Sequence, residues 1–77
     1  MMPTMSDTNR QRSTGQKLKR LRRGSGMTQA DLYEASGVAQ STIAQIENGR
    51  RKEPHPGTLK KLAEALDVSI YDLLEDE

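Results

Sequence analysis

The apolar residues of this chain recur at helical spacing in short segments, and glycines or polar turns separate one segment from the next. The clearest stripe follows the i, i+3, i+4, i+7 pattern of a single helix face and consists of Leu59, Leu62, Ala63 and Leu66. No window alternates apolar and polar residues over the length of a strand. The pattern predicts an all-α protein whose helices are too short for a long bundle.

A polar arm precedes the first helical segment. Residues 1–13 contain Pro3, show no apolar period and are predicted to be a disordered, flexible N-terminal arm. Arg10 and Arg12 in this arm could contact a polyanion, or the arm could be only a solubilising leader. Residues 14–77 are predicted to form a single domain, because the whole chain of 77 residues is too short for two.

Glycine-containing turns and capping residues divide this domain into five predicted helices. Glycine readily adopts the left-handed conformation that ends a helix. The first three helices are therefore expected to end at Gly24-Ser25-Gly26, Gly37 and Asn48-Gly49.

Helix starts carry equally local signals. Thr28 followed by Asp31, and Ser69 followed by Asp72, have the spacing of a capping box at the start of the second and fifth helices. Pro56 suits the first position of the fourth helix.

The composition excludes one kind of catalysis and several kinds of metal site. The chain has no Cys, and its one His is His55, so thiol catalysis, cysteine-ligated zinc and two-histidine metal sites are excluded. No acid, base and nucleophile form a recognisable set. We therefore expect neither an enzyme, nor a cofactor, nor a bound metal, and His55 is predicted to start a helix. With no membrane-length apolar run and no signal peptide, the chain is expected to be cytoplasmic.

The net charge of +1 conceals an uneven distribution of charge. All 12 Lys and Arg lie within residues 1–61, whereas residues 62–77 contain acidic residues and no base. A basic body with an acidic end is typical of a protein that binds a polyanion, although two solvated faces would give the same pattern. The predicted first helix carries much of the positive charge, with Leu18 and Leu21 expected to point inward. Its Lys17 and Lys19 could contact phosphate or face solvent.

Two of the predicted helices, joined by a turn at Gly37, span residues 29–48 and have the dimensions of a helix-turn-helix. In that motif the second helix enters the major groove of DNA. Here the second helix, predicted at about 39–47, has an uncharged outward face consisting of Gln40, Ser41, Ala44 and Gln45. Glutamine can form a bidentate pair with adenine. These residues could also be an ordinary soluble surface, but the lack of charge before Glu47 favours base reading.

The segment TQADLYEASGVAQSTIAQIENGR resembles the helix-turn-helix of the Cro/C1-type (XRE) DNA-binding proteins, which include the lambdoid phage repressors and Cro. The resemblance runs from about Thr14 to Leu74 and includes the downstream segment TLKKLAEALDVSIYDLL. It implies a compact five-helix, lambda-repressor-like domain that binds double-stranded DNA sequence-specifically. The implied activity is that of a transcriptional regulator, in the first place a repressor, which associates with the nucleoid when bound to DNA.

The resemblance also implies roles for individual residues. The base-reading positions of the family correspond to Gln40, Ser41 and Gln45, with Ala44 able to touch a thymine methyl group. Contacts to backbone phosphate are implied for Gln29, Asn48 and Arg50, and are extended to the neighbouring cations Arg51 and Lys52. Arg22 and Glu47 correspond to a partly buried ion pair, which is expected to be architectural because losing one partner strands the other charge.

Three features depart from the family pattern. Tyr33 occupies a position that is usually Ala, at the close crossing of the two motif helices, so either the crossing is wider or Tyr33 points to its rim. Ala39 replaces a Ser-type cap at the start of the second motif helix, at a cost of about 1 kcal/mol. The loop containing His55 is a residue longer than in common members.

The C-terminal segment is the predicted site of protein contacts. The fifth helix is expected to bury Ile70, Leu73 and Leu74, although so short a helix can leave apolar surface for a second subunit. A weak homodimer through the C-terminal helices would place the half-sites of an inverted-repeat operator roughly 34–36 Å apart. The alternative is a protein-binding module, such as an antitoxin, that uses this apolar surface and the acidic end DLLEDE, with DNA binding secondary.

Overall fold

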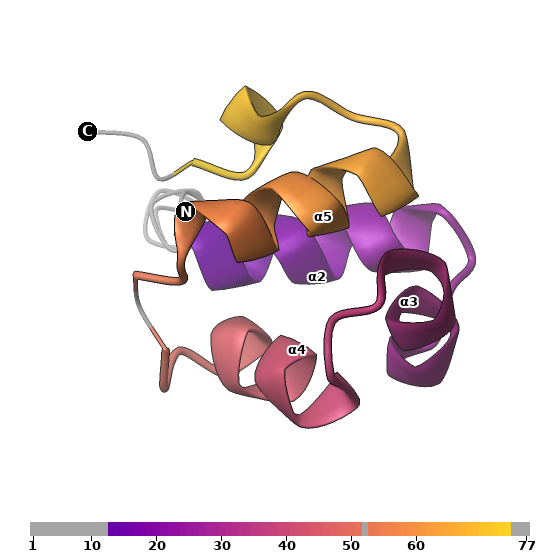
Figure 1. The fold of residues 1–77 in the computed structure, drawn as a ribbon, viewed down its shortest axis with the longest axis horizontal. Helices are drawn as coiled ribbons and strands as arrows, with labels where there is room; N and C mark the ends of the chain where they lie inside the picture. The colour runs from indigo at the N-terminus through magenta and orange to yellow at the C-terminus, as the bar shows by residue number, and fades with distance from the viewer. Residues whose placement is uncertain (1–12, 52, 75–77) are drawn as a thin grey trace, which may run out of the picture.

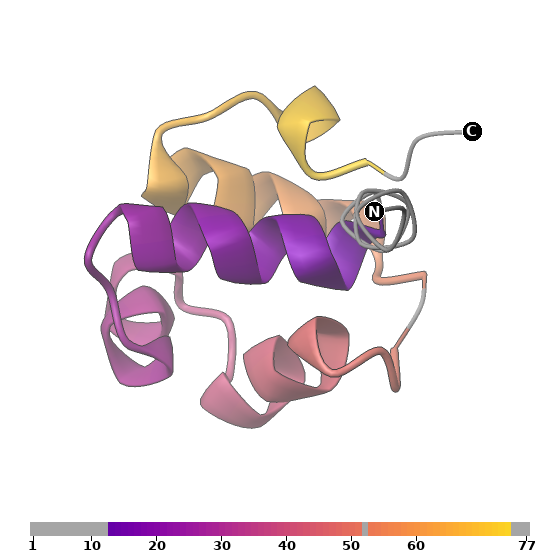
Figure 2. The same ribbon diagram turned by 180° about the vertical axis from the view of Figure 1, so that it is seen from behind.

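The computed structural model describes residues 13–51 and 53–74. Helix α2 (Thr14–Gly24) packs against α4 (Gln40–Glu47), and α5 (Pro56–Leu66) packs against α3 (Gln29–Ser36). A 3-10 turn, η1 (Ile70–Asp72), follows α5 and lies against it. Figures 1 and 2 show α3 and α4 together on one side of the molecule, with α2 and α5 above them. The described residues contain no strand, and the predicted all-α fold is confirmed.

The starts and ends of α3 follow the predicted local chemistry. The Thr28 hydroxyl oxygen accepts a hydrogen bond from the Asp31 N–H at 3.0 Å, and the Asp31 carboxylate accepts one from the Thr28 N–H at the same distance. This reciprocal pair satisfies N–H groups that a helix start otherwise leaves without a partner. Gly37 ends the helix with a φ of 77°, a conformation that strongly favours glycine. The capping box and the glycine stop are both confirmed.

Helix α5 also begins as predicted. His55 is its N-cap, and the imidazole Nδ1 accepts a hydrogen bond from the Gly57 N–H at 3.1 Å. Pro56 occupies the first turn. His55 therefore acts at a helix start, as expected for this isolated histidine.

The predicted fifth helix is instead the single 3-10 turn η1, three residues long. Ser69 and Asp72 do form the predicted capping box, but a box at this spacing fits the start of a 3-10 turn as well as that of an α-helix. So short a turn cannot direct all its apolar residues inward. Leu73 is fully buried, Ile70 is half-buried and Leu74 is 39% exposed, so the expected burial of all three was wrong for Leu74.

The core is aliphatic, as the absence of Phe and Trp predicts. Every helix contributes to it, and Val38 of the α3–α4 turn is buried in the same cluster. The six largest fully buried side chains are Leu18, Leu32, Ile43, Ile46, Leu62 and Leu73. Since Ile43 and Ile46 point into this core, the opposite side of α4 must face outward.

Candidate nucleic-acid interface

Helix α4 presents the four predicted base-reading residues together on its outward side. Gln40 and Ser41 are exposed and Ala44 and Gln45 are half-buried. Residues at these spacings are neighbours on a helix surface. The result is a continuous face with amide, hydroxyl and methyl groups and no charge, which are groups that can contact base edges in the major groove.

The turn that leads into α4 leaves the start of this helix open. Ala39 is the N-cap and makes no side-chain capping hydrogen bond, as the substitution of Ala for a Ser-type cap predicted. The N–H groups of the first turn therefore have no side-chain acceptor. Such a helix start attracts anions, because free N–H groups and the positive end of the helix dipole coincide there.

An ion pair fixes the C-terminal end of α4 against α2. The Nε of Arg22 lies 2.7 Å from the Oε2 of Glu47, and a second guanidinium nitrogen donates to Oε1 at 3.0 Å. The two side chains are only 10% and 4% exposed. Arg22 also donates to the Met27 carbonyl at 2.8 Å, which ties the pair to the segment before α3. Two parallel bonds of this kind are strong and orient both partners.

The ion pair shifts the pKa of Arg22. Hydrogen bonding to Glu47 raises the pKa of the Arg22 guanidinium above its ordinary value; burial opposes the rise, and the Glu47 charge adds to it. The guanidinium therefore remains charged throughout the neutral range. A charged Arg22 therefore anchors the end of α4 at neutral pH.

A close backbone approach also positions α4, and the sequence pattern did not reveal it. A Cβ atom added to Gly15 in α2 would fall well inside 3.0 Å of the Ile46 carbonyl oxygen, and 3.2 Å from the Glu47 carbonyl oxygen. Only a residue without a side chain allows α2 to lie this close to the last turn of α4. Gly15 and the Arg22–Glu47 pair thus hold the same end of the helix.

Gln29 joins the ion pair from the start of α3. Its amide nitrogen donates to the Glu47 Oε1 at 3.1 Å, and the residue is half-buried. Gln29 lines an open polar hollow of about 340 Å³ together with Lys19, Ala44 and Asn48. The structure therefore brings two of the predicted phosphate contacts, Gln29 and Asn48, to one concave surface beside the outward face of α4.

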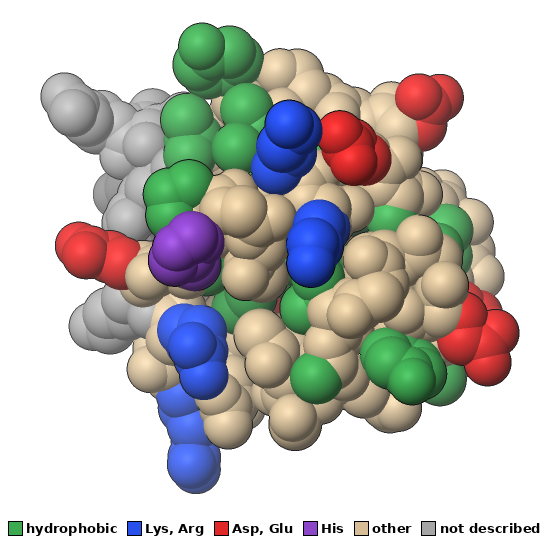
Figure 3. All heavy atoms as spheres, in the orientation of Figure 1, with side chains coloured by type: hydrophobic (Ala, Val, Ile, Leu, Met, Phe, Trp, Pro, Cys, Tyr) green, Lys and Arg blue, Asp and Glu red, His purple; other side chains and the backbone are tan. Residues whose placement is uncertain are grey.

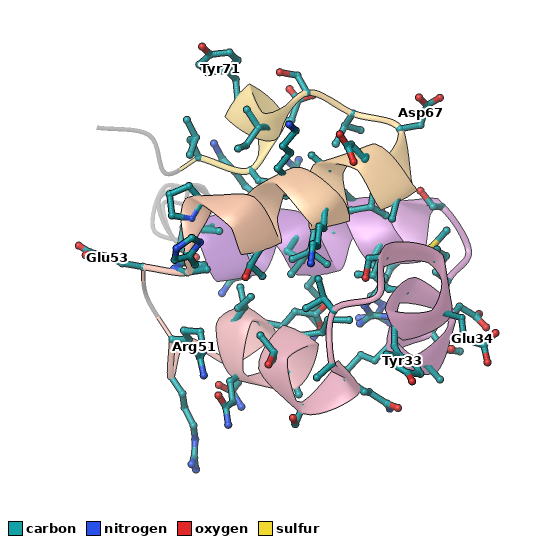
Figure 4. All side chains as sticks on the ribbon, in the orientation of Figure 1. Tyr33, Glu34, Arg51, Glu53, Asp67 and Tyr71 are labelled. Carbon is teal, nitrogen blue, oxygen red and sulfur yellow. The ribbon has the colours of Figure 1, made fainter. Side chains whose placement is uncertain are left out.

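The remaining predicted phosphate contacts lie in the loop after α4. Arg50 and Arg51 are exposed, and Figure 4 shows Arg51 beside the C-terminal end of α4. The Arg51 guanidinium donates to the Gln45 side-chain oxygen at 3.1 Å. One predicted phosphate contact thus holds one predicted base-reading amide, a link that sequence reasoning missed. Lys52 lies outside the described residues.

Tyr33 lies at the rim of the α3–α4 crossing. Its residue surface is 47% exposed, and Figure 4 shows the side chain on the α4 side of α3, directed outward. Of the two arrangements expected for a phenol at a position that is usually Ala, the structure has the outward one. No widening of the crossing is needed to accommodate the ring.

The charged side chains of α2 differ from the prediction in which of them are buried and which are exposed. Lys17 is buried, and its ammonium group donates to the Leu74 carbonyl oxygen at 2.7 Å, so neither the phosphate role nor the solvated role expected for it was right. A lysine stem can be buried along apolar surface while its end reaches a polar partner. Lys19, by contrast, is exposed. Leu18 is fully buried and Leu21 half-buried, and Arg22 is buried as the expected ion pair requires.

Residues 13–51 and 53–74 contain no group of three or more potential metal-ligating side chains. Within the same ranges, no helix is long and apolar enough to cross a membrane.

The arrangement of α3, the Gly37 turn and α4 against the other helices defines a helix-turn-helix domain. Residues 18–73 match the model of the helix-turn-helix family, and the chain belongs to this family, in its Cro/C1-type (XRE) form. The family consists of DNA-binding regulators rather than enzymes.

Several curated relatives carry similar domains. The chain is 45% identical over 60 residues to the uncharacterized HTH-type transcriptional regulator RghRB of Bacillus subtilis (strain 168). It is 44% identical over 62 residues to the HTH-type transcriptional repressor RghR, and 35% over 63 residues to the HTH-type transcriptional regulator SinR, of the same organism. These matches cover 78%, 80% and 82% of this chain but 43%, 46% and 57% of the relatives, so the chain spans about half their length. No solved structure matches the chain significantly.

Proposed function

We propose that this protein is a transcriptional repressor that binds double-stranded DNA sequence-specifically and reads the major groove with α4. The observation that carries the proposal is the uncharged outward face of α4, on a helix whose far end is anchored by the Arg22–Glu47 pair. A rigidly held helix with neutral hydrogen-bonding groups suits base reading, which needs fixed geometry more than charge. The similarity to RghR, which is named as a repressor, supports repression rather than activation.

Within this proposal the residues divide into two groups. The base-reading group is Gln40, Ser41, Ala44 and Gln45. The phosphate-binding group is Gln29, Asn48, Arg50, Arg51 and Lys52, which surround α4 in sequence or in space. Phosphate contacts supply affinity for any DNA and set the register of the helix, whereas base contacts supply the preference for one sequence.

A homodimer on an inverted-repeat operator follows from the same proposal. An open groove of about 260 Å³ is lined mainly by apolar side chains, among them Pro54, Leu59, Ile70 and Leu74. Tyr71, next to it, is 77% exposed and points away from the body in Figure 4. A second copy joined through this C-terminal region would present two α4 helices to half-sites about one helical turn apart, roughly 34–36 Å. Such a protein would act in the cytoplasm, on the nucleoid.

The proposal is tested by selecting bound sequences from a random duplex DNA pool at near-physiological salt. An enriched inverted repeat is expected. Background binding without enrichment would contradict the proposal and favour the alternative, a protein-binding module such as an antitoxin that uses the C-terminal groove.

A single substitution then tests the base-reading role. Gln40→Ala should weaken binding to the selected site by about 1–3 kcal/mol and leave binding to random DNA nearly unchanged. Glu64→Ala, which removes an exposed side chain of α5, is the control and should leave the sequence preference intact. Equal losses of Gln40→Ala on selected and random DNA would remove Gln40 from the base-reading group.

A further inference from the structure

The outward face of α2 carries a concentration of positive charge. Lys19, Arg20 and Arg23 are exposed there and, together with Gln16 and Gly24, line an open hollow of about 570 Å³. No acidic side chain lines this hollow. Over residues 13–51 and 53–74, none of the three cations is paired with a carboxylate. Figure 3 shows the opposite face, where the basic side chains over α5 stand singly and one lies beside an acidic side chain.

This clustering is unfavourable for the isolated helix. Lys19 and Arg23 are four residues apart and Arg20 and Arg23 are three apart, spacings at which like charges repel and destabilise a helix. Arg23 lies in the last turn of α2, where the helix dipole favours a cation, but Lys19 and Arg20 precede that turn. The helix dipole therefore explains only part of the arrangement, and a polyanionic partner explains all of it.

The basic hollow is continuous with the surface beside α4. Lys19 lines both this hollow and the polar hollow that contains Gln29 and Asn48. Figure 2 shows α2 in front of α5 and above α4. A phosphate backbone that passes Gln29 and Asn48 therefore meets Lys19 next, and beyond it Arg20 and Arg23.

We propose that Lys19, Arg20 and Arg23 form a second phosphate-binding surface, which contacts the DNA backbone flanking the base pairs that α4 reads. This inference rests on the proposed function, because it takes the orientation of DNA from α4. The contact is to phosphate alone, so it adds affinity without adding sequence preference. As a consequence, the protein would cover a longer stretch of DNA than the base pairs that α4 can reach.

The test removes only the two arginines, which lie outside the polar hollow beside α4. Arg20→Gln combined with Arg23→Gln is compared with Lys60→Gln combined with Lys61→Gln, which removes the same charge from two exposed positions on α5. Each variant is titrated at several salt concentrations. One duplex ends at the selected site, and the other extends it by about one helical turn, roughly 10 base pairs, on each side. Circular dichroism verifies that the variants are folded.

On the long duplex, the logarithm of the binding constant should fall less steeply with the logarithm of salt concentration for the arginine variant than for the wild type. The magnitude of the slope should decrease by about two, or about 0.9 for each lost phosphate contact. On the short duplex its slope should equal that of the wild type, and its sequence preference should not change. The lysine variant should match the wild type on both duplexes.

Two results would overturn the inference. The arginine variant could behave like the lysine variant on the long duplex, or it could weaken binding to the short and the long duplex equally. Failure of the proposed function would give a different result, because the wild-type protein would then select no sequence from the random DNA pool. The salt dependence of binding of the two variants to long random duplexes would still test whether the surface of Lys19, Arg20 and Arg23 contacts phosphate.

Discussion

The substitution Gly15→Ala tests how the position of α4 is set. The added Cβ would enter the space of the Ile46 carbonyl oxygen and press on the Glu47 carbonyl oxygen. These are backbone atoms at the end of α4, so no side chain can rotate away and the two helices must separate. Overpacking against rigid atoms costs about 2–3 kcal/mol. The ordinary gain of about 0.5–1 kcal/mol for replacing a helical glycine by alanine offsets part of this. We expect a net loss of about 2 kcal/mol.

Urea and thermal unfolding followed by circular dichroism measure this loss, which corresponds to a decrease in Tm of about 8–16 °C for a domain of this size. Gly24→Ala is the matched control. It also lies in α2, and a Cβ there would meet nothing within 4 Å. This variant should be more stable than the wild type by about 0.5–1 kcal/mol, because only the change in backbone entropy remains. If Gly15→Ala were as stable as Gly24→Ala, the close approach would not set the spacing of α2 and α4.

Two further substitutions test the surroundings of α4. Arg22→Ala should destabilise the protein by about 3 kcal/mol in urea unfolding, because it strands the buried Glu47 carboxylate. The raised pKa of Arg22 means that the stability contributed by its charge is present at neutral pH. That contribution is lost only as pH rises from the unfolded-state pKa of arginine through the higher folded-state pKa. The cost of Arg22→Ala should therefore be constant across neutral pH, and a cost that varied there would contradict this reasoning. Tyr33→Ala should change stability by less than about 1 kcal/mol in thermal unfolding, since the ring is 47% exposed; a loss of about 3–5 kcal/mol would mean that the ring fills the helix crossing.

The features that could be predicted from sequence are those encoded by neighbouring residues. The capping box of Thr28 and Asp31, the left-handed stop at Gly37 and the helix start at His55 each depend on contacts within three residues. The Arg22–Glu47 pair could be predicted only from the family resemblance, because 25 residues separate the two partners and no local pattern connects them.

The features that could not be predicted depend on contacts that local patterns do not contain. Gly15 has the appearance of an ordinary early-helix residue, and the carbonyl group that requires it lies about 30 residues further along the chain. Lys17 belongs to a run of cations that indicates a solvated face, yet its hydrogen-bond acceptor is the carbonyl of Leu74, 57 residues away. The sequence did not predict that η1 is only three residues long. Ser69 and Asp72 mark where a turn begins and carry no information on where it ends.

In the proposed interface, affinity for DNA and sequence preference would come from different residues around α4. The outward face of α4 has no charge before Glu47, and the carboxylate of Glu47 is occupied by Arg22 and Gln29. Charge that would attract any DNA is thus kept off the proposed base-reading helix. Beside that helix, Arg51 donates a hydrogen bond to Gln45 and so fixes one of its amides from outside. Because that bond is exposed, exchanging it for a phosphate contact costs little free energy, whereas the buried bonds to Glu47 cannot be exchanged without stranding a charge. The end of α4 is therefore held by buried bonds where it meets α2, and by the exposed Arg51–Gln45 bond at the edge proposed to face DNA.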